Sequence, residues 1–316
     1  MKTFHKLLLF TFILSAILTG LEFSARKMYP RSDLYEQLHN FNKNKADTEV
    51  IVLGISHAAY GINPEIFEQK TYNLAYPTQD IFYAYELLKN NLRQLKNLKT
   101  VILFVEPFSF GYDVEKNSRH LVVDYSKNGY GPRNGMTINI ALQELSQFMN
   151  HRTNFLPDFY NFLSGKKLQD DKTDQLMFNG FRRTEKIIFE EDAVIAGKKR
   201  ALRHTTLPFF DKNIEDENYR FLDAFVDLAV NNSIKVILVT PPYSREYYSN
   251  FTNDFLTNFT NRLNTLLAKY QGNIGYKSYA QDKDFSHKYF HDIDHLNYEG
   301  ANLLSQKIKI DFPQLK

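Results

Sequence analysis

The sequence predicts an α/β fold, namely a flavodoxin-like three-layer αβα sandwich with a parallel sheet of about five strands. Two observations lead to this expectation. Short apolar runs that stop at glycine or proline alternate along the chain with longer amphipathic segments. This alternation is typical of a parallel sheet that is covered by helices on both faces. The chain has 316 residues, which is enough for one large domain that carries an insertion.

Five apolar segments are the expected strands. Residues 49–54, 100–105 and 235–240 are the clearest, because each is short, largely apolar and followed by glycine or proline within two residues. Residues 72–75 and 274–279 are weaker candidates. Asp80 is a candidate N-cap for the first amphipathic helix. The expected helices cover residues 80–97, 215–232, 252–270 and 297–309.

Residues 108–212 lack this rhythm and are interpreted as an insertion into a domain that covers residues 49–316. Helical patterns are visible near residues 137–149 and 153–164. The insertion is locally basic, which is expected to mean solvated faces, or a surface for anionic lipid or polymer. The basic residues are Lys166, Lys167, Arg182, Arg183, Lys198, Lys199, Arg200 and Arg203.

The N-terminal segment over residues 7–23 is apolar and has Glu22 as its single charged residue. It fits either a transmembrane anchor or a signal peptide. Phe23 would stand at the −3 position of the expected cleavage site, where a small residue is required. We therefore expect an uncleaved single-pass anchor over residues 1–27 and a lead-in over residues 28–48. The main domain is placed outside the cytoplasm, at the cell membrane.

Composition excludes several classes of function. The net charge is +3 and no nucleic-acid-binding motif is present, so no nucleic-acid partner is expected. The chain has no cysteine, which removes disulfides, thiolate metal sites and a cysteine nucleophile. No cofactor is expected either.

The first candidate for chemistry is Ser56, which follows Gly54 at the end of the first expected strand. Ligands bind beyond the carboxyl ends of strands in open α/β sheets. A serine at this place is exposed at the edge of the sheet, with its backbone N–H directed into the same space. The alternative is a turn serine that caps the next helix.

The second candidate is Asp292-Ile293-Asp294-His295, just before the last expected helix. Asp292 can accept a hydrogen bond from one ring nitrogen of His295, which leaves the other nitrogen free to take a proton from a serine. One alternative is a pair of solvated helix caps. Another is a metal cluster in which His291 and Asp294 join Asp292 and His295, although no further ligand region stands out.

Together the two segments resemble the SGNH (GDSL-like) hydrolase superfamily, over residues 50–105 and 233–310. The counterparts of its motifs are Gly54-Ile55-Ser56 and Asp292-Ile293-Asp294-His295. The chain is also similar to the anchored branch that includes the teichoic-acid D-alanylation and alginate O-acetylation proteins. The resemblance implies that Ser56 is the nucleophile, that His295 is the base and that Asp292 orients it.

The chain departs from the superfamily at the oxyanion hole. The second family block supplies a glycine N–H, whereas this chain has Asn73-Leu74-Ala75-Tyr76. The third block supplies an asparagine, whereas this chain has Glu106-Pro107-Phe108. The expected oxyanion donors are therefore the backbone N–H groups of Ser56 and, more weakly, Ala75. Losing one such donor typically costs about 10²–10³ in rate.

Other residues carry weaker expectations. Asn73, Glu106 and Tyr243 are candidates for the lining of the pocket, and Arg245 lies close to Tyr243 in the sequence. The side chain of His57 is expected to point away from the serine and to be structural.

The resulting hypothesis is an extracytoplasmic serine acyltransferase or esterase that acts on a cell-surface glycopolymer through an acyl-Ser56 intermediate. A multi-pass acyltransferase is a possible partner in the membrane. One alternative is a non-catalytic, degenerate SGNH-like module that binds polymer or docks the acyltransferase. Another is a lipid esterase that acts near the bilayer.

Overall fold

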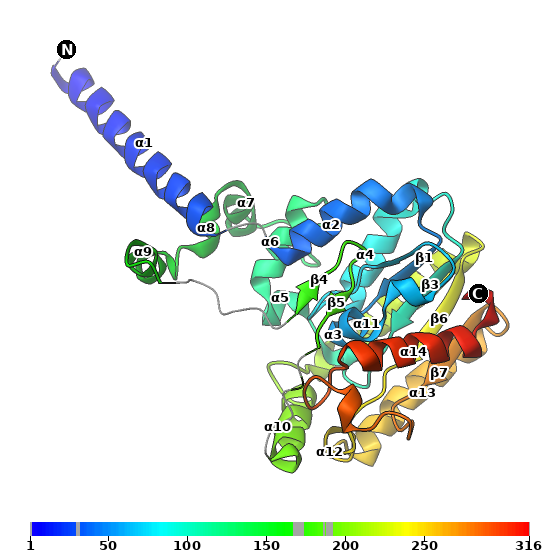
Figure 1. Cartoon of the computed structure of the whole chain (residues 1–316). Coiled ribbons are helices and arrows are strands. Elements are labelled where there is room, and N and C mark those ends of the chain that lie inside the picture. Colours follow the sequence, from blue (N-terminus) through cyan, green and yellow to red (C-terminus); the bar gives the residue numbers. More distant parts are fainter. Residues whose placement is uncertain (1, 30–31, 167–173, 186, 188–191, 316) are drawn as a thin grey trace. The chain divides into compact units, whose positions relative to one another are not determined.

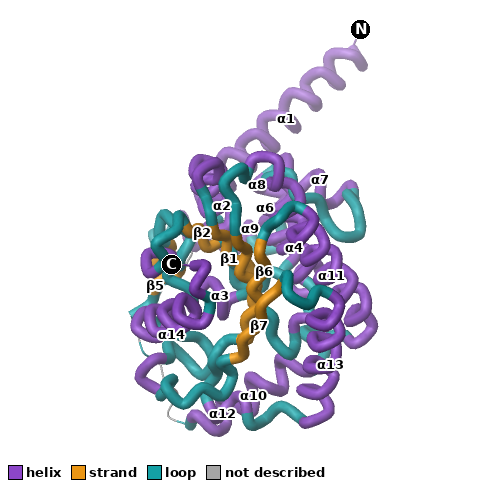
Figure 2. Tube along the Cα trace, turned by 90° about the vertical axis from the view of Figure 1, so that its right-hand side faces the viewer, coloured by secondary structure: helices purple, strands orange, loops and turns teal. Residues whose placement is uncertain are grey.

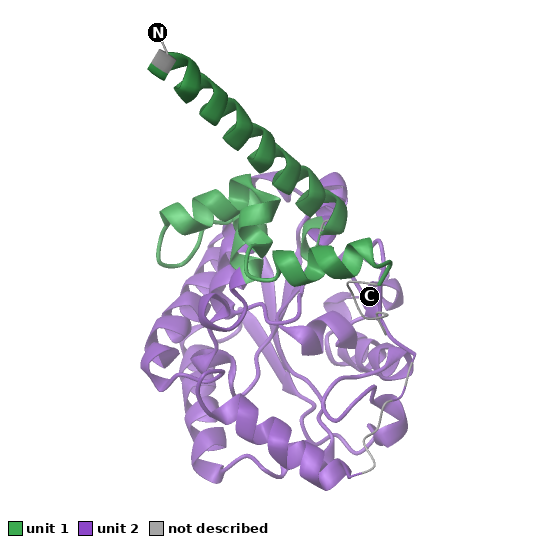
Figure 3. Ribbon diagram, turned by 90° about the vertical axis from the view of Figure 1, so that its left-hand side faces the viewer, with its two compact units in different colours: residues 1–35, 120–172 green, residues 36–119, 173–316 purple. Residues whose placement is uncertain are grey.

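The computed structural model describes residues 2–29, 32–166, 174–185, 187 and 192–315 (Figure 1). The chain divides into two compact units (Figure 3). The smaller unit combines residues 1–35 with residues 120–172, and the larger combines residues 36–119 with residues 173–316. The larger unit contains the sheet and the candidate site.

The larger unit is built on a five-stranded sheet in which every neighbouring pair is parallel. The strand order is β2-β1-β3-β6-β7, so the first strand of the chain lies inside the sheet. This is the flavodoxin-like order, and the predicted fold class is confirmed. The strands are β1 (Val50–Leu53), β2 (Thr71–Asn73), β3 (Thr100–Phe104), β6 (Lys235–Thr240) and β7 (Ile274–Ser278).

Helices cover both faces of this sheet (Figure 2). On one face α3 (Ser56–Gly61) contacts α14 (Tyr298–Asp311), and on the other α4 (Ile81–Asn91) contacts α11 (Glu215–Asn231). Next to α11, α13 (Asn253–Lys269) packs against β7. Because both faces are covered, the central strands are buried throughout and read as continuous apolar runs.

The predicted start of α4 is correct in detail. The Asp80 carboxylate accepts a hydrogen bond from Tyr83 N–H at 2.9 Å. This satisfies one of the backbone donors that a helix start leaves without a partner.

One core cluster joins the sheet to α3 and α14. It combines inward-facing strand residues with residues of those two helices, so burial of their apolar surface holds the helices on the sheet. The cluster includes Val50, Val52, Ala58, Ala59, Ile62, Ile102, Phe104, Ile237, Val239, Leu304 and Ile308.

The segment that the sequence shows as an insertion is shared between the two units. Residues 173–212 belong to the larger unit, where α10 (Ala193–Thr205) packs on α12 (Arg245–Tyr248). A short antiparallel pair, β4 (Gln175–Leu176) and β5 (Arg182–Arg183), precedes α10. Lys167, one of the basic residues noted above, lies outside the described residues.

The smaller unit contains the N-terminal helix α1 (Lys2–Met28). Residues Thr3–Met28 of this helix are long and apolar enough to cross a membrane. This unit also contains α7 (Ile138–Leu145), α8 (Gln147–His151), α9 (Phe155–Leu163) and most of α6 (Arg119–Lys127). In the larger unit lie most of α2 (Asp33–Asn44) and all of α5 (Val114–Asn117).

Candidate active site

Ser56 is the first residue of α3, directly beyond the end of β1. The turn between them depends on Gly54, whose φ of +134° is a conformation that L side chains rarely adopt. A Cβ atom at this position would stand 2.9 Å from Phe104 Cβ and 3.2 Å from Ala58 Cβ. The Gly54 N–H also donates to Gln79 Oε1 at 3.1 Å, which fixes the turn. The glycine therefore sets where Ser56 leaves the sheet.

His295 lies on a tight loop that closes through a β-bridge between Phe290 and Leu296. Within this loop the Asp292 carboxylate accepts hydrogen bonds from the N–H groups of Asp294 at 3.1 Å and His295 at 2.8 Å. These are local bonds that aspartate characteristically makes with the backbone that follows it. The spacing of Asp292 and His295 therefore organises the loop itself.

Asn297 ends this loop and starts α14. Its side-chain oxygen accepts from Gly300 N–H at 3.0 Å, and its amide donates to the backbone oxygen of Lys288 at 2.7 Å. A Cβ atom on Gly300 would lie 2.2 Å from the Tyr289 backbone oxygen, so the glycine permits the close approach. The helix start thus holds the loop that carries His295.

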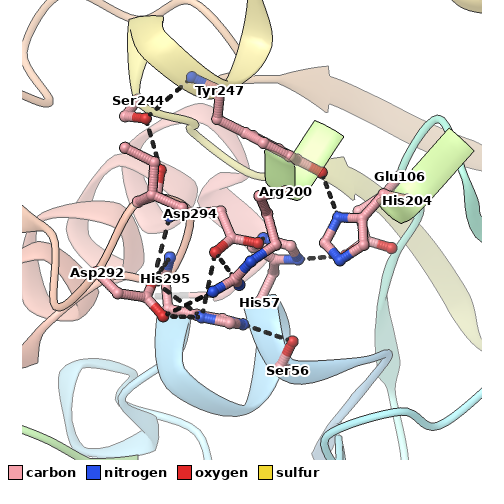
Figure 4. A network of polar contacts seen from close by, with 11 residues as sticks. Ser56, His57, Glu106, Arg200, His204, Ser244, Tyr247, Asp292, Asp294 and His295 are labelled. Atoms are coloured by element: carbon pink, nitrogen blue, oxygen red, sulfur yellow. Dashed lines mark hydrogen bonds and ion pairs between the residues drawn. The ribbon is translucent and has the colours of Figure 1, made fainter. Parts of the chain in front are cut away.

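The structure brings Ser56, His295 and Asp292 together (Figure 4). The distance between Ser56 Oγ and His295 Nε2 is 2.7 Å. On the other side of the ring, His295 Nδ1 lies 3.0 Å from each carboxylate oxygen of Asp292. An ionised carboxylate can only accept, so Nδ1 carries the ring proton and Nε2 is left to accept the Ser56 proton.

The electrostatics of the site favour an imidazole that can gain a proton. Burial by itself would lower the pKa of His295, but the negative charges of Asp294 and Asp292 outweigh it and raise the pKa above its ordinary value. For Asp292 the signs are reversed: burial by itself would raise the pKa of this carboxyl group, but the positive charge of His295 lowers it below its ordinary value. A base of this kind is more able to accept a proton from the serine.

Arg200 from α10 joins the site through both aspartates. Its Nη1 lies 2.5 Å from Asp294 Oδ1, and its Nη2 lies 3.6 Å from Asp292 Oδ2. Burial by itself would raise the pKa of Asp294, which is fully buried, but the positive charges of His295 and Arg200, together with the proximity of the His57 ring, hold that pKa well below the ordinary value. The expectation that Arg200 lies on a solvated face is therefore wrong.

Arg182 also departs from the expectation that the basic residues of the insertion lie on solvated faces. It is buried, and its Nη1 lies 2.7 Å from an Asp174 carboxylate oxygen. Asp174 also accepts a hydrogen bond from the Tyr60 hydroxyl at 3.1 Å, and the Tyr60 ring lies 5.3 Å from the His295 ring. Part of the basic segment therefore supports the site from inside the protein.

His57 lies buried beside His295, with the two ring centroids 5.0 Å apart and the rings stacked. Its Nδ1 is 3.7 Å from Glu106 Oε1 and its Nε2 is 3.5 Å from Asp294 Oδ2, outside hydrogen-bond geometry. Burial lowers the pKa of His57 and raises that of Glu106 to about 7. The side chain of His57 lies inside the protein, stacked against the ring that contacts Ser56.

A metal ion fits this cluster poorly. Ligand atoms of His57, Asp294 and His295 lie within 4.8 Å of one another. However, the guanidinium of Arg200 already neutralises Asp294, and its charge opposes a cation at the same place. His291, which belonged to the alternative metal hypothesis, has its Nδ1 3.2 Å from Thr184 Oγ1.

The backbone donors near Ser56 differ from the sequence expectation. The N–H of Ala75 donates to Asn73 Oδ1 at 3.0 Å and so is not directed at a ligand. Over the described part of the chain, the N–H of Ser56 has no acceptor. The N–H of Thr78 likewise has no acceptor among the described residues. Thr78 has a φ of 68°, which is uncommon outside glycine, and it lines the pocket onto which Ser56 opens.

Ser56 opens onto a pocket of about 270 Å³ with an aromatic wall and several positive groups. Its lining residues include Tyr60, Thr78, Arg203, His204, Phe209 and His291. The three expected lining residues are absent from this wall. Asn73 is buried and donates to the backbone oxygens of Ala58 and Ile62, Glu106 is buried behind the site, and Tyr243 is buried beside a different surface hollow.

From the sequence, Arg200 and Arg203 were expected only as members of the basic insertion and His204 was not considered, whereas all three line the pocket from α10. Asp192 caps this helix by accepting from Ile195 N–H at 3.0 Å, and a capping aspartate before an alanine-rich run is a visible helix signal. The contact between Arg200 and Asp294 joins positions 94 residues apart and leaves no trace in the local pattern.

Comparison with known proteins adds little to this geometry. No family model matches the chain, and no curated protein matches it. A solved structure provisionally assigned as a platelet activating factor from Streptococcus pneumoniae is similar at 11% identity and a TM-score of 0.44, over 97% of this chain and 99% of that one.

Two further solved structures have comparable values. A protein provisionally assigned as an acylhydrolase from Bacteroides fragilis has 12% identity and a TM-score of 0.43, over 91% of this chain and 100% of its own. A GDSL-like lipase from Bacteroides thetaiotaomicron has 12% identity and a TM-score of 0.42, over 89% and 100%. At these TM-scores the similarity does not assign the chain to a family.

Proposed function

We propose that the chain is an acyl-transfer enzyme of the SGNH (GDSL-like) type that forms an acyl-Ser56 intermediate. The proposal depends on one observation, the hydrogen-bonded row from Ser56 Oγ through His295 to Asp292 at the wall of a pocket. A nucleophile, a base and a carboxylate that orients the base form the arrangement that activates a serine hydroxyl.

The first half-reaction follows from this arrangement. Ser56 gives its proton to His295 Nε2 while Oγ forms a bond to the carbonyl carbon of the acyl donor. The tetrahedral intermediate then collapses: the bond to the leaving oxygen breaks, and the imidazolium returns the proton to that oxygen. Ser56 keeps the acyl group as an ester.

The second half-reaction repeats these steps with an acceptor hydroxyl. The hydroxyl of water or of a sugar loses its proton to His295 and attacks the acyl-Ser56 carbonyl. Collapse breaks the bond to Oγ, which takes the proton back from the imidazolium. The proposed reaction is hydrolysis when water is the acceptor and acyl transfer when a sugar is the acceptor.

The proposed oxyanion donors are the backbone N–H groups of Ser56 and Thr78. Both line the pocket, and both lack an acceptor among the described residues. Donors that are already fixed in place stabilise the charge of a tetrahedral intermediate without reorganisation. This assignment replaces Ala75, whose N–H is taken by Asn73.

The proposed acceptor is a cell-surface glycopolymer outside the cytoplasm. The pocket offers the rings of Tyr60 and Phe209 to the apolar face of a sugar, and the exposed Arg203 to a polar or anionic substituent. A multi-pass acyltransferase in the same membrane is the proposed acyl donor.

The N-terminal helix is proposed to stay on the mature chain as a single-pass anchor. Its last two turns are part of a folded core, since Ala25 is fully buried and Met28 is 5% exposed against Phe155. A signal peptide that is removed would not supply core residues to the mature protein.

A non-catalytic module is the second candidate function. It is favoured by the state of the segment over residues 73–76, which has no glycine and whose Ala75 N–H is already bonded. Such a module would bind the polymer or dock the acyl-donating partner without transferring the acyl group itself.

Labelling with a serine-reactive fluorophosphonate separates the two candidates. We expect the full chain to be labelled, and Ser56→Ala and His295→Ala to lose the label. Ser286→Ala is the matched control, because Ser286 is an exposed serine of the same unit away from the site. A folded wild-type chain that takes up no label would contradict the catalytic proposal and support the module.

A further inference from the structure

Helix α7 of the smaller unit exposes one apolar face. Ile138 is 83% exposed, Leu142 44% and Leu145 78%. Residues at spacings of four and three share one side of a helix, so these three side chains form a single stripe. The polar residues Asn139 and Gln143 lie away from that stripe on the helix circumference.

Helix α9 exposes a second apolar stripe with the same spacing. Leu156 is 74% exposed, while Tyr160 and Leu163 are both 69% exposed. The neighbouring face of α9 packs inward, because Phe155 is 2% exposed and Phe159 contacts the same core cluster. The exposed stripe is thus additional to the face that holds α9 in the fold.

Both helices belong to the compact unit that contains α1, and within that unit they lie around the C-terminal end of α1 (Figure 1). The Glu22 carboxylate of α1 accepts hydrogen bonds from Ser146 Oγ at 2.7 Å and from Phe148 N–H at 3.1 Å, at the start of α8. Helix α7 contacts α8, and α9 contacts α1 directly. The two stripes are therefore tied to the end of the helix that is long enough to cross a membrane.

We infer that α7 and α9 rest in the headgroup region of the lipid bilayer that α1 crosses. Amphipathic helices with exposed leucine, isoleucine and tyrosine bind at this depth, and tyrosine favours the boundary between lipid and water. Two exposed stripes of this kind in one compact unit are uncommon on a surface that faces only water. The inference rests on the proposed anchor and goes beyond it, because it adds a second membrane contact.

Lipid is favoured over a protein partner by continuity with α1. A helix that enters the bilayer brings the residues packed on its end to the lipid surface without any further recognition. Because the stripes sit on two separate short helices around that end, a flat lipid surface can cover both. A protein partner would need a surface shaped to each.

The test uses the absence of native cysteine, which allows single cysteine variants of the full chain to be labelled without further changes. Leu142→Cys and Leu156→Cys report on the stripes and carry an environment-sensitive nitrobenzoxadiazole label. The protein is reconstituted alone in nanodiscs of phosphatidylcholine and phosphatidylglycerol. Quenching is then measured with nitroxide-labelled lipid and with aqueous iodide.

We expect lipid nitroxide to quench both stripe labels several-fold more strongly than it quenches a label at Ser286→Cys, an exposed site of the larger unit. Ile13→Cys, in the middle of α1, reports on the anchor itself. Stripe labels that iodide quenches as fully as Ser286→Cys, while Ile13→Cys stays lipid-quenched, would overturn the inference and leave the anchor standing. Such stripes would face water or a protein partner.

A label at Ile13→Cys that iodide quenches would instead overturn the proposed anchor, and the inference with it. Catalysis is tested separately by the fluorophosphonate experiment, so failure of one does not resemble failure of the other.

Discussion

At the scale of single residues, two carboxylates serve His295 in different ways. Asp292 holds Nδ1 at 3.0 Å and so fixes the tautomer of the ring. Asp294 lies 3.5 Å from the same atom, is fully buried, and pairs chiefly with Arg200. The negative charges of both aspartates raise the pKa of His295, but only Asp292 is hydrogen-bonded to the ring and so orients the proposed base.

Asparagine variants separate these two roles. Asp292→Asn should lower kcat by about 10³–10⁴, because an amide can stabilise the wrong tautomer of His295. Asp294→Asn should keep the tautomer but remove a charge that raises the pKa of His295. Since the base acts in its neutral form, the acidic limb of the profile of kcat/KM against pH should move to lower pH. Equal losses of kcat with unchanged pH profiles would contradict this division.

The burial of Glu106 leads to a prediction about the stability of the fold and not about the reaction rate. Burial raises its pKa from 4.5 to about 7, so the folded state holds the proton more tightly than the unfolded state. Its contribution is therefore fully present below about pH 4.5 and is lost as the pH rises towards 7, by up to about 3 kcal/mol. Glu106→Gln should flatten this decline in thermal unfolding measured from pH 4.5 to 7.5. A decline as steep as in the wild type would show that Glu106 is not its source.

The local part of the site was predictable from the sequence, whereas the long-range part was not. The segments that carry Ser56 and His295 have recognisable patterns because a strand end and a capped helix start are short-range features. The expectation for Ala75 failed because Asn73, two residues earlier, takes its N–H. The pairing of Arg200 with Asp294 was not predicted, because it depends on how α10 packs, which no local spacing records.

At the scale of elements, the junction of β1 with α3 places the proposed nucleophile. The strand ends at Leu53, and the helix begins at Ser56, so only two residues make the turn. The turn requires Gly54 to adopt a φ of +134° next to Phe104. The geometry of this turn therefore affects both the stability of the fold at the carboxyl end of β1 and the position of Ser56.

Gly54→Ala should lower the free energy of unfolding by about 1–3 kcal/mol. Alanine is strained at the φ of this position, and its methyl group would approach Phe104 too closely. Fluorophosphonate labelling should also slow, since Ser56 would shift relative to His295. Gly272→Ala is a useful control, because its φ of +81° is similarly restricted but its Cβ atom meets open space. Unfolding by urea at fixed pH measures the difference. Equal losses in both variants would mean that the contact with Phe104 is unimportant.

The regular elements of the larger unit were predicted well, because strands and long helices have strong periodicity. The helices around 80–97, 215–232, 252–270 and 297–309 correspond to α4, α11, α13 and α14. Short elements escaped detection: α3 has six residues, and β4 and β5 have two each. A pattern that short contains less than two turns or one alternation, and only tertiary contacts stabilise it.

At the scale of the whole molecule, each of the two compact units combines two segments that are separated in the sequence. The smaller unit combines the N-terminal helix with residues 120–172, and the larger unit surrounds that segment in sequence. No periodicity in the sequence reveals this division, because it depends on which distant segments share a core. The contact between α1 and α9 is of that kind.

Retention of α1 is the prediction at this scale. The full chain should remain in the membrane fraction after washing at high salt and at alkaline pH. Mass spectrometry should find peptides from residues that precede Ala25, because removal of α1 would expose Phe155 and Phe159. A soluble protein whose N-terminus begins near residue 25 would contradict the proposed anchor.

The site joins two segments that are far apart in the sequence, since Ser56 and His295 are separated by 239 positions. A polypeptide that is still being synthesised or translocated carries the serine for most of its length before the imidazole emerges. In such a nascent chain the Ser56 hydroxyl has no base beside it, so we expect it not to form the proposed acyl-Ser56 intermediate. If Ser56 is the proposed nucleophile, we therefore expect its reactivity to appear only after the last helix, α14, has packed onto α3.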